Sequence, residues 1–348
     1  MLLDGIHVPL TTPFYPDGRL NLRKLEHNVD RYSRTPVAGM IVLGANGEPN
    51  TLSDVETREA LEAAVAMAAD EKVMLAGVAR DGVSSALEVA AIAAGLRYDG
   101  VVLRLPPTLL GGGVREILTY FQAIADGSAL PVLLTSAPGR ELTVETIAEL
   151  AGHPQIMGVV EGSGRIAALK AATSFVKRTA TVTTIFAAVT ERMLAKAIAP
   201  VAGSGSYIAL ESLGTGTAVA VAPPVAGPGL KTRTRETGFQ VLGGSTVEML
   251  TAFRAGALGA VPRMAACAPQ ACYEVFAGWK DGDEGLAEEK QSRLIQASHR
   301  IEGELGVPGL KYACDLNGYF GGRPRLPFVM ASGTEKAEID ELMRGMRN

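Results

Sequence analysis

The amino-acid sequence predicts an α/β fold of the (β/α)8 TIM barrel class, because short apolar runs alternate with segments of helical periodicity through most of its 348 residues. Eight apolar runs are present, and a segment with helical spacing follows each of them. Gly, Pro, Asn and Asp mark the turns between the two kinds of segment. The expected strands are 6–12, 39–43, 73–79, 100–105, 131–135, the run that starts at Ile156, 239–242 and 257–264.

The helices are expected where capping residues precede an amphipathic pattern. Ser53, with Glu56 three residues later, predicts a capping box for one of them. The expected barrel helices are 21–34, 53–69, 84–97, 114–126, one after Thr143, one from Arg165, 245–256 and 269–279. Three further helices, 284–304, 306–318 and 334–346, predict a C-terminal helical extension over 281–348 beyond a barrel over 1–280.

The segment from about 178 to 238 interrupts this alternation. One strand, its helix and the next strand need ~30 residues, and the distance from Val160 to Val241 is much longer. Its first part, 185–199, has helical spacing, whereas 200–230 consists largely of Gly, Ala, Pro, Ser and Thr. We interpret this insertion as a surface excursion, partly disordered, because such a composition supports no packed core. A lid or a subunit contact on the loop side of the barrel is the alternative.

Composition excludes several functional classes. The chain has 33 basic and 37 acidic residues and no basic run, which argues against nucleic acid as a partner. No apolar run reaches the ~18 residues of a membrane span, and the N-terminus has no signal-peptide pattern, so a cytoplasmic protein is expected. Cys267, Cys272 and Cys314 lie in apolar surroundings and are expected to be buried free thiols.

The stretch from Ile156 to Arg165 predicts a buried strand that ends in a glycine-rich turn with one acid, Glu161, before a helix begins. Such strand ends carry the catalytic residues of parallel α/β barrels. Val160 occupies this end. Its side chain is an inert hydrocarbon, which can act neither as a nucleophile nor as an acid or base.

Several strand ends together resemble the dihydrodipicolinate synthase / N-acetylneuraminate lyase family, in particular its 4-hydroxy-2-oxoglutarate aldolase branch. The motifs that carry the resemblance follow the family's order over nearly the whole chain. They are PLTTPF (9–14), LGANGE (43–48), APGR (137–140), HPQIMGVVEGSG (153–164), FQVLGGS (239–245), GVPGLK (306–311) and GYFGGRPRLP (318–327). The resemblance implies a barrel with a C-terminal helical piece, a homodimer or homotetramer, and a lyase that binds pyruvate or another 2-oxo acid as a lysine Schiff base.

Residue by residue, the resemblance implies a retained carboxylate site but not the covalent chemistry. The backbone amides of Ala45 and Asn46 match the loop that holds the oxo-acid carboxylate, and Arg140 matches an arginine that meets a second carboxylate. Thr135 occupies the position of the catalytic tyrosine. Val160 occupies the position of the Schiff-base lysine, so the inherited mechanism is expected to be lost or altered.

Two arginines lie in runs that are otherwise apolar. Arg104 is in the fourth run and Arg263 in the eighth, where it shares strand parity with the inward-pointing Val261. A buried arginine needs a partner, and Glu161 is a candidate. The arginines are interpreted either as a structural ion pair or, with Arg140, as a clamp for a carboxylate or phosphate.

Weaker signals leave other functions open. Gly244 and Ser245, which open a helix after the seventh strand, resemble a barrel phosphate site, although glycines at such turns commonly meet a steric need. No metal site, Ser/His/Asp triad or cofactor is predicted from the scattered histidines. We therefore expect a small-acid pocket without Schiff-base chemistry. The alternatives are an active lyase that uses another residue, and a phosphate-ligand barrel enzyme.

Overall fold

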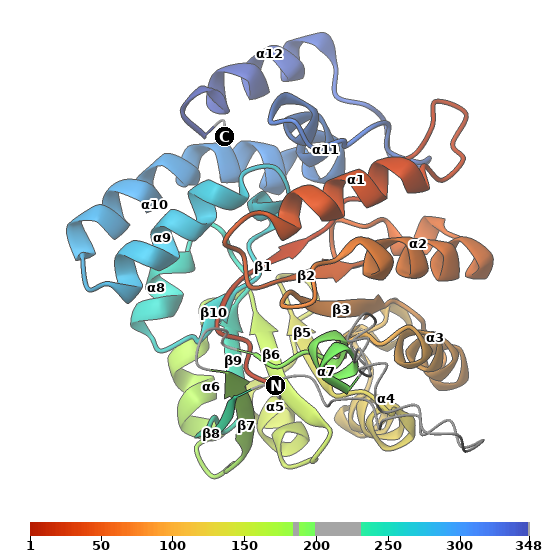
Figure 1. Cartoon of the computed structure of the whole chain (residues 1–348), viewed down its shortest axis with the longest axis vertical. Coiled ribbons are helices and arrows are strands. Elements are labelled where there is room, and N and C mark those ends of the chain that lie inside the picture. Colours follow the sequence, from red (N-terminus) through yellow and green to blue (C-terminus); the bar gives the residue numbers. More distant parts are fainter. Residues whose placement is uncertain (184–187, 199–230, 347–348) are drawn as a thin grey trace, which may run out of the picture.

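The computed structural model describes residues 1–183, 188–198 and 231–346. Eight parallel strands close into a barrel in the order β1-β10-β9-β6-β5-β4-β3-β2, and helices surround it (Figure 1). The predicted (β/α)8 class is confirmed, because the sheet closes on itself. The barrel strands are β1 Gly5–Pro9, β2 Gly39–Val42, β3 Val73–Val78, β4 Gly100–Arg104, β5 Val132–Ser136, β6 Ile156–Glu161, β9 Gln240–Gly243 and β10 Gly259–Ala260.

The barrel helices begin at polar capping residues or at turns. The predicted capping box is present, because Ser53 Oγ accepts from the Glu56 amide and the Glu56 carboxylate accepts from the Ser53 amide. Asn21 and Thr143 cap their helices through a side-chain oxygen in the same way. The helices around the barrel are α1 Leu22–Ser33, α2 Asp54–Met67, α3 Val83–Gly95, α4 Val114–Gly127, α5 Val144–Ala151, α6 Ile166–Ala172, α8 Met249–Arg254 and α9 Pro269–Lys280.

The eighth strand is shorter than the apolar run 257–264 predicts. It contains only Gly259–Ala260, and a 3₁₀ helix, Arg263–Ala266, follows Pro262. Proline has no amide hydrogen to continue the ladder, so the chain leaves the sheet at this point. The expectation that Arg263 lies in the strand is therefore wrong, and this residue instead starts the connection to α9.

The C-terminal extension packs beside α1 and α9, at the top of Figure 1. Asn28 on α1 donates a hydrogen bond to the Phe320 carbonyl at 2.9 Å, and the ring of Tyr32 stacks on Tyr319 with centroids 4.3 Å apart. These contacts join the extension to the first barrel helix. Its elements are α10 Glu284–Ser298, the π-helix His299–Glu304, α11 Gly306–Leu316, α12 Gly333–Leu342 and the 3₁₀ helix Arg344–Met346.

The described part of the insertion contains a two-stranded antiparallel sheet, β7 Thr179–Thr183 with β8 Thr232–Glu236, and a helix, α7 Glu191–Ile198. Thr190 caps α7 by accepting from the Met193 amide at 3.1 Å. The predicted helix 185–199 is thus present in part. Residues 184–187 and 199–230, which include the stretch expected to be partly disordered, lie outside the described residues.

The described part of the insertion lies at the N-terminal end of the barrel. Arg178 donates to the carbonyl of Ile156, the first residue of β6, and the Glu191 amide donates to Asp99, which precedes β4, at 2.7 Å. Ala188 packs among the side chains inside the barrel together with Leu3. The insertion leaves after helix α6 and not after strand β6. The expectation that the insertion leaves from the loop side of the barrel is therefore wrong for these residues. The alternative that they form a lid over that side depended on this expectation and is wrong as well.

Cys267, Cys272 and Cys314 are buried and free, as predicted. Burial raises the pKa of each thiol, which keeps it protonated and weakly reactive. None of the described helices combines the length and the apolarity that a membrane crossing requires.

Buried His7 on β1 makes stability depend on pH. Burial lowers its pKa to about 4, against smaller opposing effects from the Leu3 backbone and Asp4. The unfolded chain therefore takes up a proton near pH 6.5 that the folded chain takes up only near pH 4, so stability falls as the pH drops through this window. We expect a loss of about 2 kcal/mol at pH 5 relative to neutral pH. Urea unfolding of wild type and His7→Leu measures it, and parallel pH profiles would contradict the prediction.

Candidate functional site

The ends of β4, β5 and β6, with the loops that follow the strands, form the C-terminal end of the barrel, here called the mouth. Val160 on β6 lies in register with Thr135 on β5 and Leu242 on β9. Its side chain is 7% exposed and belongs to the apolar cluster inside the barrel, together with Leu133 and Val261. Position 160 therefore faces the barrel interior, where strand-end residues of this fold meet a ligand.

Thr135 contributes a hydroxyl group at the same level. Its Oγ1 donates to the Leu103 carbonyl of β4 at 3.1 Å. This hydrogen bond satisfies the hydroxyl proton within the sheet. Thr135 therefore has a structural partner, and its hydroxyl is far weaker as an acid than the phenol that the family resemblance implies at this position.

The loop after β2 carries the candidate carboxylate site. Among the described residues, the amide groups of Ala45 and Asn46 donate no hydrogen bond, so both remain available to an anion. The Asn46 side chain is buried and fully engaged. It donates to the carbonyls of Pro9 and Arg263 at 3.0 Å each, and its oxygen accepts from Arg263 Nε at 2.9 Å. The side chain of Asn46 thus fixes the loop, while its backbone amide keeps no partner among the described residues.

Arg104 and Arg140 come together at the mouth. Arg104 ends β4, and Arg140 closes the turn after β5, where its amide donates to the Ala137 carbonyl at 2.8 Å. Gly139 adopts a φ of +77°, which the turn requires at its third position. Burial lowers the pKa of Arg104, the positive charge of Arg140 lowers it further, and Asp81 opposes both. The two arginines thus end or follow adjacent strands, and each disfavours a second positive charge nearby.

Neither arginine forms an ion pair with an acidic side chain in the part of the chain that the structure describes. Arg104 Nη2 donates to Asn50 Oδ1 at 2.6 Å. Arg140 Nη1 is buried and, within the described residues, has no hydrogen-bond acceptor. A buried guanidinium nitrogen without an acceptor is costly, and an anion at the mouth would supply one.

Arg263 and Glu161 do not join this pair. Arg263 binds Asn46 and donates from Nη1 to the Glu302 carbonyl at 3.0 Å. Glu161 pairs with Arg165, four residues later, at 2.9 Å. The expectation that Glu161 is the partner of Arg104 or Arg263 is wrong, because the turn after β6 places the Arg165 guanidinium next to the Glu161 carboxylate.

The turn after β9, with Gly244 and Ser245, is better explained by close packing of the backbone than by a phosphate site. A Cβ on Gly244 would lie 3.1 Å from Val160 Cγ1 and from the Glu161 carbonyl carbon, so the close approach of β6 favours glycine. Ser245 Oγ accepts from the Glu248 amide at 3.2 Å. A small hollow of about 30 Å³ beside the turn is lined by two carboxylates, those of Glu161 and Glu248. Glu161 is already paired with Arg165, so the negative charge that disfavours a phosphate here comes from Glu248.

The contacts of three lysines in the described structure argue against their replacing a strand-six lysine. Lys72 donates to the Thr35 and Val37 carbonyls at the N-terminal end. Lys170 lies on α6 against Gly256. Lys311, on α11, forms an ion pair with Glu48 at 2.5 Å.

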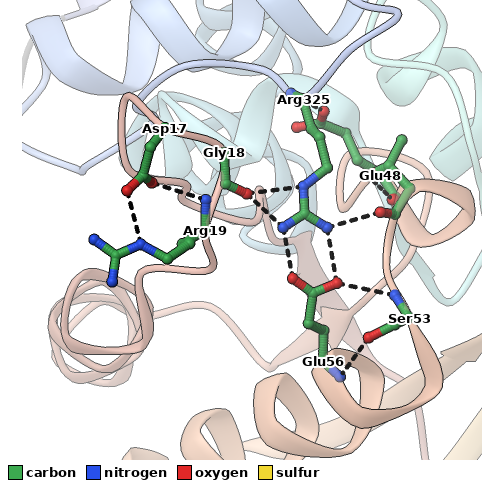
Figure 2. A network of polar contacts seen from close by, with 8 residues as sticks. Asp17, Gly18, Arg19, Glu48, Ser53, Glu56 and Arg325 are labelled. Carbon is green, nitrogen blue, oxygen red and sulfur yellow. Dashed lines mark hydrogen bonds and ion pairs between the residues drawn. The ribbon is translucent and has the colours of Figure 1, made fainter.

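Sequence reasoning missed the residues that anchor the candidate carboxylate loop. Glu48 ends that loop, and Lys311 and Arg325 of the C-terminal extension bind its carboxylate. Figure 2 shows Arg325 between Gly18 and Glu56, beside Glu48. The motifs GVPGLK and RPRLP contain both basic residues. No local pattern, however, reveals a partner 277 residues away.

Comparison with known proteins gives one consistent answer. The chain is 37% identical over 177 residues to 4-hydroxy-tetrahydrodipicolinate synthase of Xanthomonas campestris pv. campestris, a match that covers 49% of this chain and only 58% of that relative. It is 26% identical over 352 aligned positions to the enzyme of the same name from Acidiphilium cryptum, with 99% of both covered. The crystal structure of the chloride-inhibited dihydrodipicolinate synthase from Acinetobacter baumannii, complexed with pyruvate, has the same fold, with a TM-score of 0.76, 20% identity and 99% of both chains covered.

The profile of the Dihydrodipicolinate synthetase family matches residues 2–212 and 230–345. These ranges include the barrel strands, the candidate mouth and the C-terminal extension. The chain therefore belongs to the Dihydrodipicolinate synthetase family.

Proposed function

We propose that this chain binds a small carboxylate or 2-oxo acid at the mouth of its barrel and does not capture it as a Schiff base. The family's chemistry is of the lyase or aldolase type. The lysine on which that chemistry depends corresponds to Val160 in this chain. An isopropyl group cannot attack a carbonyl, and removal of a nucleophile costs on the order of 10⁴-fold in rate.

The observation that carries the binding proposal is the pair Arg104 and Arg140. The charge of Arg140 disfavours the charged form of Arg104, and Asp81 opposes this effect less strongly. Arg140 Nη1 is also buried without an acceptor among the described residues, so a bound anion would stabilise both groups. The free amides of Ala45 and Asn46 add donors after β2, and Arg104 reaches the segment that follows this loop through Asn50. A 2-oxo acid offers a carboxylate to these donors, and pyruvate is the ligand of the Acinetobacter baumannii structure.

The test is calorimetric titration with pyruvate and with 2-oxoglutarate, followed by borohydride reduction and mass spectrometry. We expect binding without a reduced adduct. Arg104→Gln and Arg140→Gln should each weaken binding by roughly 10- to 100-fold, because each removes charge-assisted hydrogen bonds. Arg115→Gln, on the exposed side of α4, is the matched control and should bind like wild type. Wild-type affinity in both mouth variants would overturn the proposal.

The second candidate is an active synthase or aldolase in which another group replaces the lysine. The names of the relatives support it. A stable borohydride adduct on any lysine of the wild-type protein would favour it over the non-covalent proposal.

We also propose that the chain assembles as a homodimer or homotetramer. Large apolar side chains are exposed on two segments, and a subunit contact would cover them. They are Leu110, Val114, Leu326 and Val329. Light scattering of the purified protein measures the assembly.

A further inference from the structure

Glu48 holds an unfavourable backbone conformation at the end of the candidate carboxylate loop. Its φ is +51°, and Leu43, at the start of the loop, has a φ of +58°. Residues other than glycine rarely adopt this left-handed region, because the Cβ atom makes it unfavourable. The conformation persists only where surrounding contacts impose it. The contacts of Glu48 therefore decide the shape of the loop.

Those contacts come from the C-terminal extension. Glu48 is 4% exposed, its Oε1 lies 2.5 Å from Lys311 Nζ, and its Oε2 accepts from the Arg325 amide at 2.8 Å. The Lys311 ammonium also lies over the Phe14 ring, 4.5 Å from its centroid. The buried carboxylate is thus fixed from two sides by residues that do not belong to the barrel.

Arg325 also fastens the loops on either side of Glu48 (Figure 2). Its guanidinium forms a bidentate ion pair with the Glu56 carboxylate, with N–O distances of 2.6 and 2.8 Å. It also donates to the Gly18 carbonyl at 2.5 and 3.0 Å and to the Thr51 carbonyl at 2.7 Å. This planar fork joins the loop after β1, the loop after β2 and the first turn of α2. A lysine at this position could not make the same set of bonds.

The candidate carboxylate loop is therefore anchored at two points. Asn46 ties its middle to Pro9 and Arg263, while Glu48 ties its end to Lys311 and Arg325. The free amides of Ala45 and Asn46 lie between the two strained positions. If the second anchor were lost, the loop could relax toward ordinary backbone angles, and the amides would no longer be held toward the mouth.

We infer that Lys311 and Arg325 are positioning residues for ligand binding, and that they hold the amides of Ala45 and Asn46 ready for the carboxylate of a small 2-oxo acid. This inference rests on the proposed function. It makes the C-terminal extension part of the machinery that shapes the binding site, because Lys311 and Arg325 hold the loop that carries the amides.

The test compares Arg325→Met with Arg300→Met, using pyruvate as the probe. Arg300 is also in the extension and also forms a fork, to Glu304 and Glu338, but it does not touch the loop. We expect Arg325→Met to weaken pyruvate binding roughly tenfold, since it removes preorganisation. Arg300→Met should bind like wild type. All titrations are made well below the unfolding temperature, so that a change in stability alone does not alter the dissociation constant.

Hydrogen exchange supplies the second measurement. The peptide that contains residues 44–48 should exchange faster in Arg325→Met than in wild type or Arg300→Met. This readout needs no ligand, so it still tests the anchor if wild type binds no carboxylate and the proposed function fails. Arg325→Lys keeps the charge but not the fork, and decides the question if Arg325→Met does not fold. A folded Arg325 variant with wild-type affinity and wild-type exchange would overturn the inference.

Discussion

Replacing Val160 with lysine is expected to give a protein that borohydride links to pyruvate, whereas the wild-type chain gives no such adduct. Position 160 faces the barrel interior at the end of β6, beside Thr135 and Leu242. A primary amine at this place would meet the carbonyl of a 2-oxo acid held by the donors at the mouth. The gain is large, because an absent nucleophile typically costs on the order of 10⁴-fold.

The surroundings of position 160 favour the reactive form of such an amine. Its neighbours in the interior cluster include Leu133, Leu242 and Val261, and Val160 itself is nearly buried. Desolvation in an apolar site lowers the pKa of a lysine, so more of the amine is neutral and nucleophilic near pH 7. Carbon–carbon cleavage should stay slow, because Thr135 supplies no acid–base group comparable to a tyrosine.

Mass spectrometry after borohydride reduction measures the result. Val160→Met is the matched control, since it has similar length but no amine. If Val160→Lys folds and binds pyruvate but gives no adduct, position 160 does not correspond to the family's lysine site. The assignment of Val160 would then be wrong.

Lys311→Met is expected to lower the free energy of unfolding by about 3–5 kcal/mol, because it leaves the Glu48 carboxylate charged and buried without its partner. The side chains of Lys311 and Glu48 are 1% and 0% exposed. Burial lowers the pKa of Lys311, and the charge of Glu48 opposes that shift, so the two groups depend on each other. Urea unfolding at neutral pH measures the loss.

The double variant Lys311→Met, Glu48→Gln provides the control. Removal of both charges should recover much of the lost stability, since a neutral amide is far less costly to bury than an unpaired carboxylate. Equal destabilisation in the single and double variants would show that packing around Lys311, and not the charge of Glu48, accounts for the effect.

Most of the barrel could be predicted from local sequence patterns, whereas the end of its eighth strand could not. The alternation of apolar runs with helical spacing predicts the closed barrel, and the Ser53 and Glu56 pattern predicts its capping box. Both features depend on residues a few positions apart, whose preferences act before any distant contact forms. The short eighth strand was missed because the sequence interpretation gave the apolar run more weight than Pro262, which ends the ladder.

The sequence by itself determined the barrel, the order of its strands along the chain, and the chemical identity of Val160 at the end of β6. Only the tertiary structure decided which charges meet. In the folded chain, the charge of Arg140 acts on Arg104, and Glu161 forms an ion pair with Arg165. The Arg325 amide donates to the Glu48 carboxylate. The tertiary structure also placed the described part of the insertion at the end of the barrel opposite the mouth. The physical reason is that helix and strand patterns are set by neighbours in the chain, whereas the partner of a charged group depends on how turns, strand ends and the C-terminal extension pack, from four positions apart for Glu161 and Arg165 to 277 for Glu48 and Arg325.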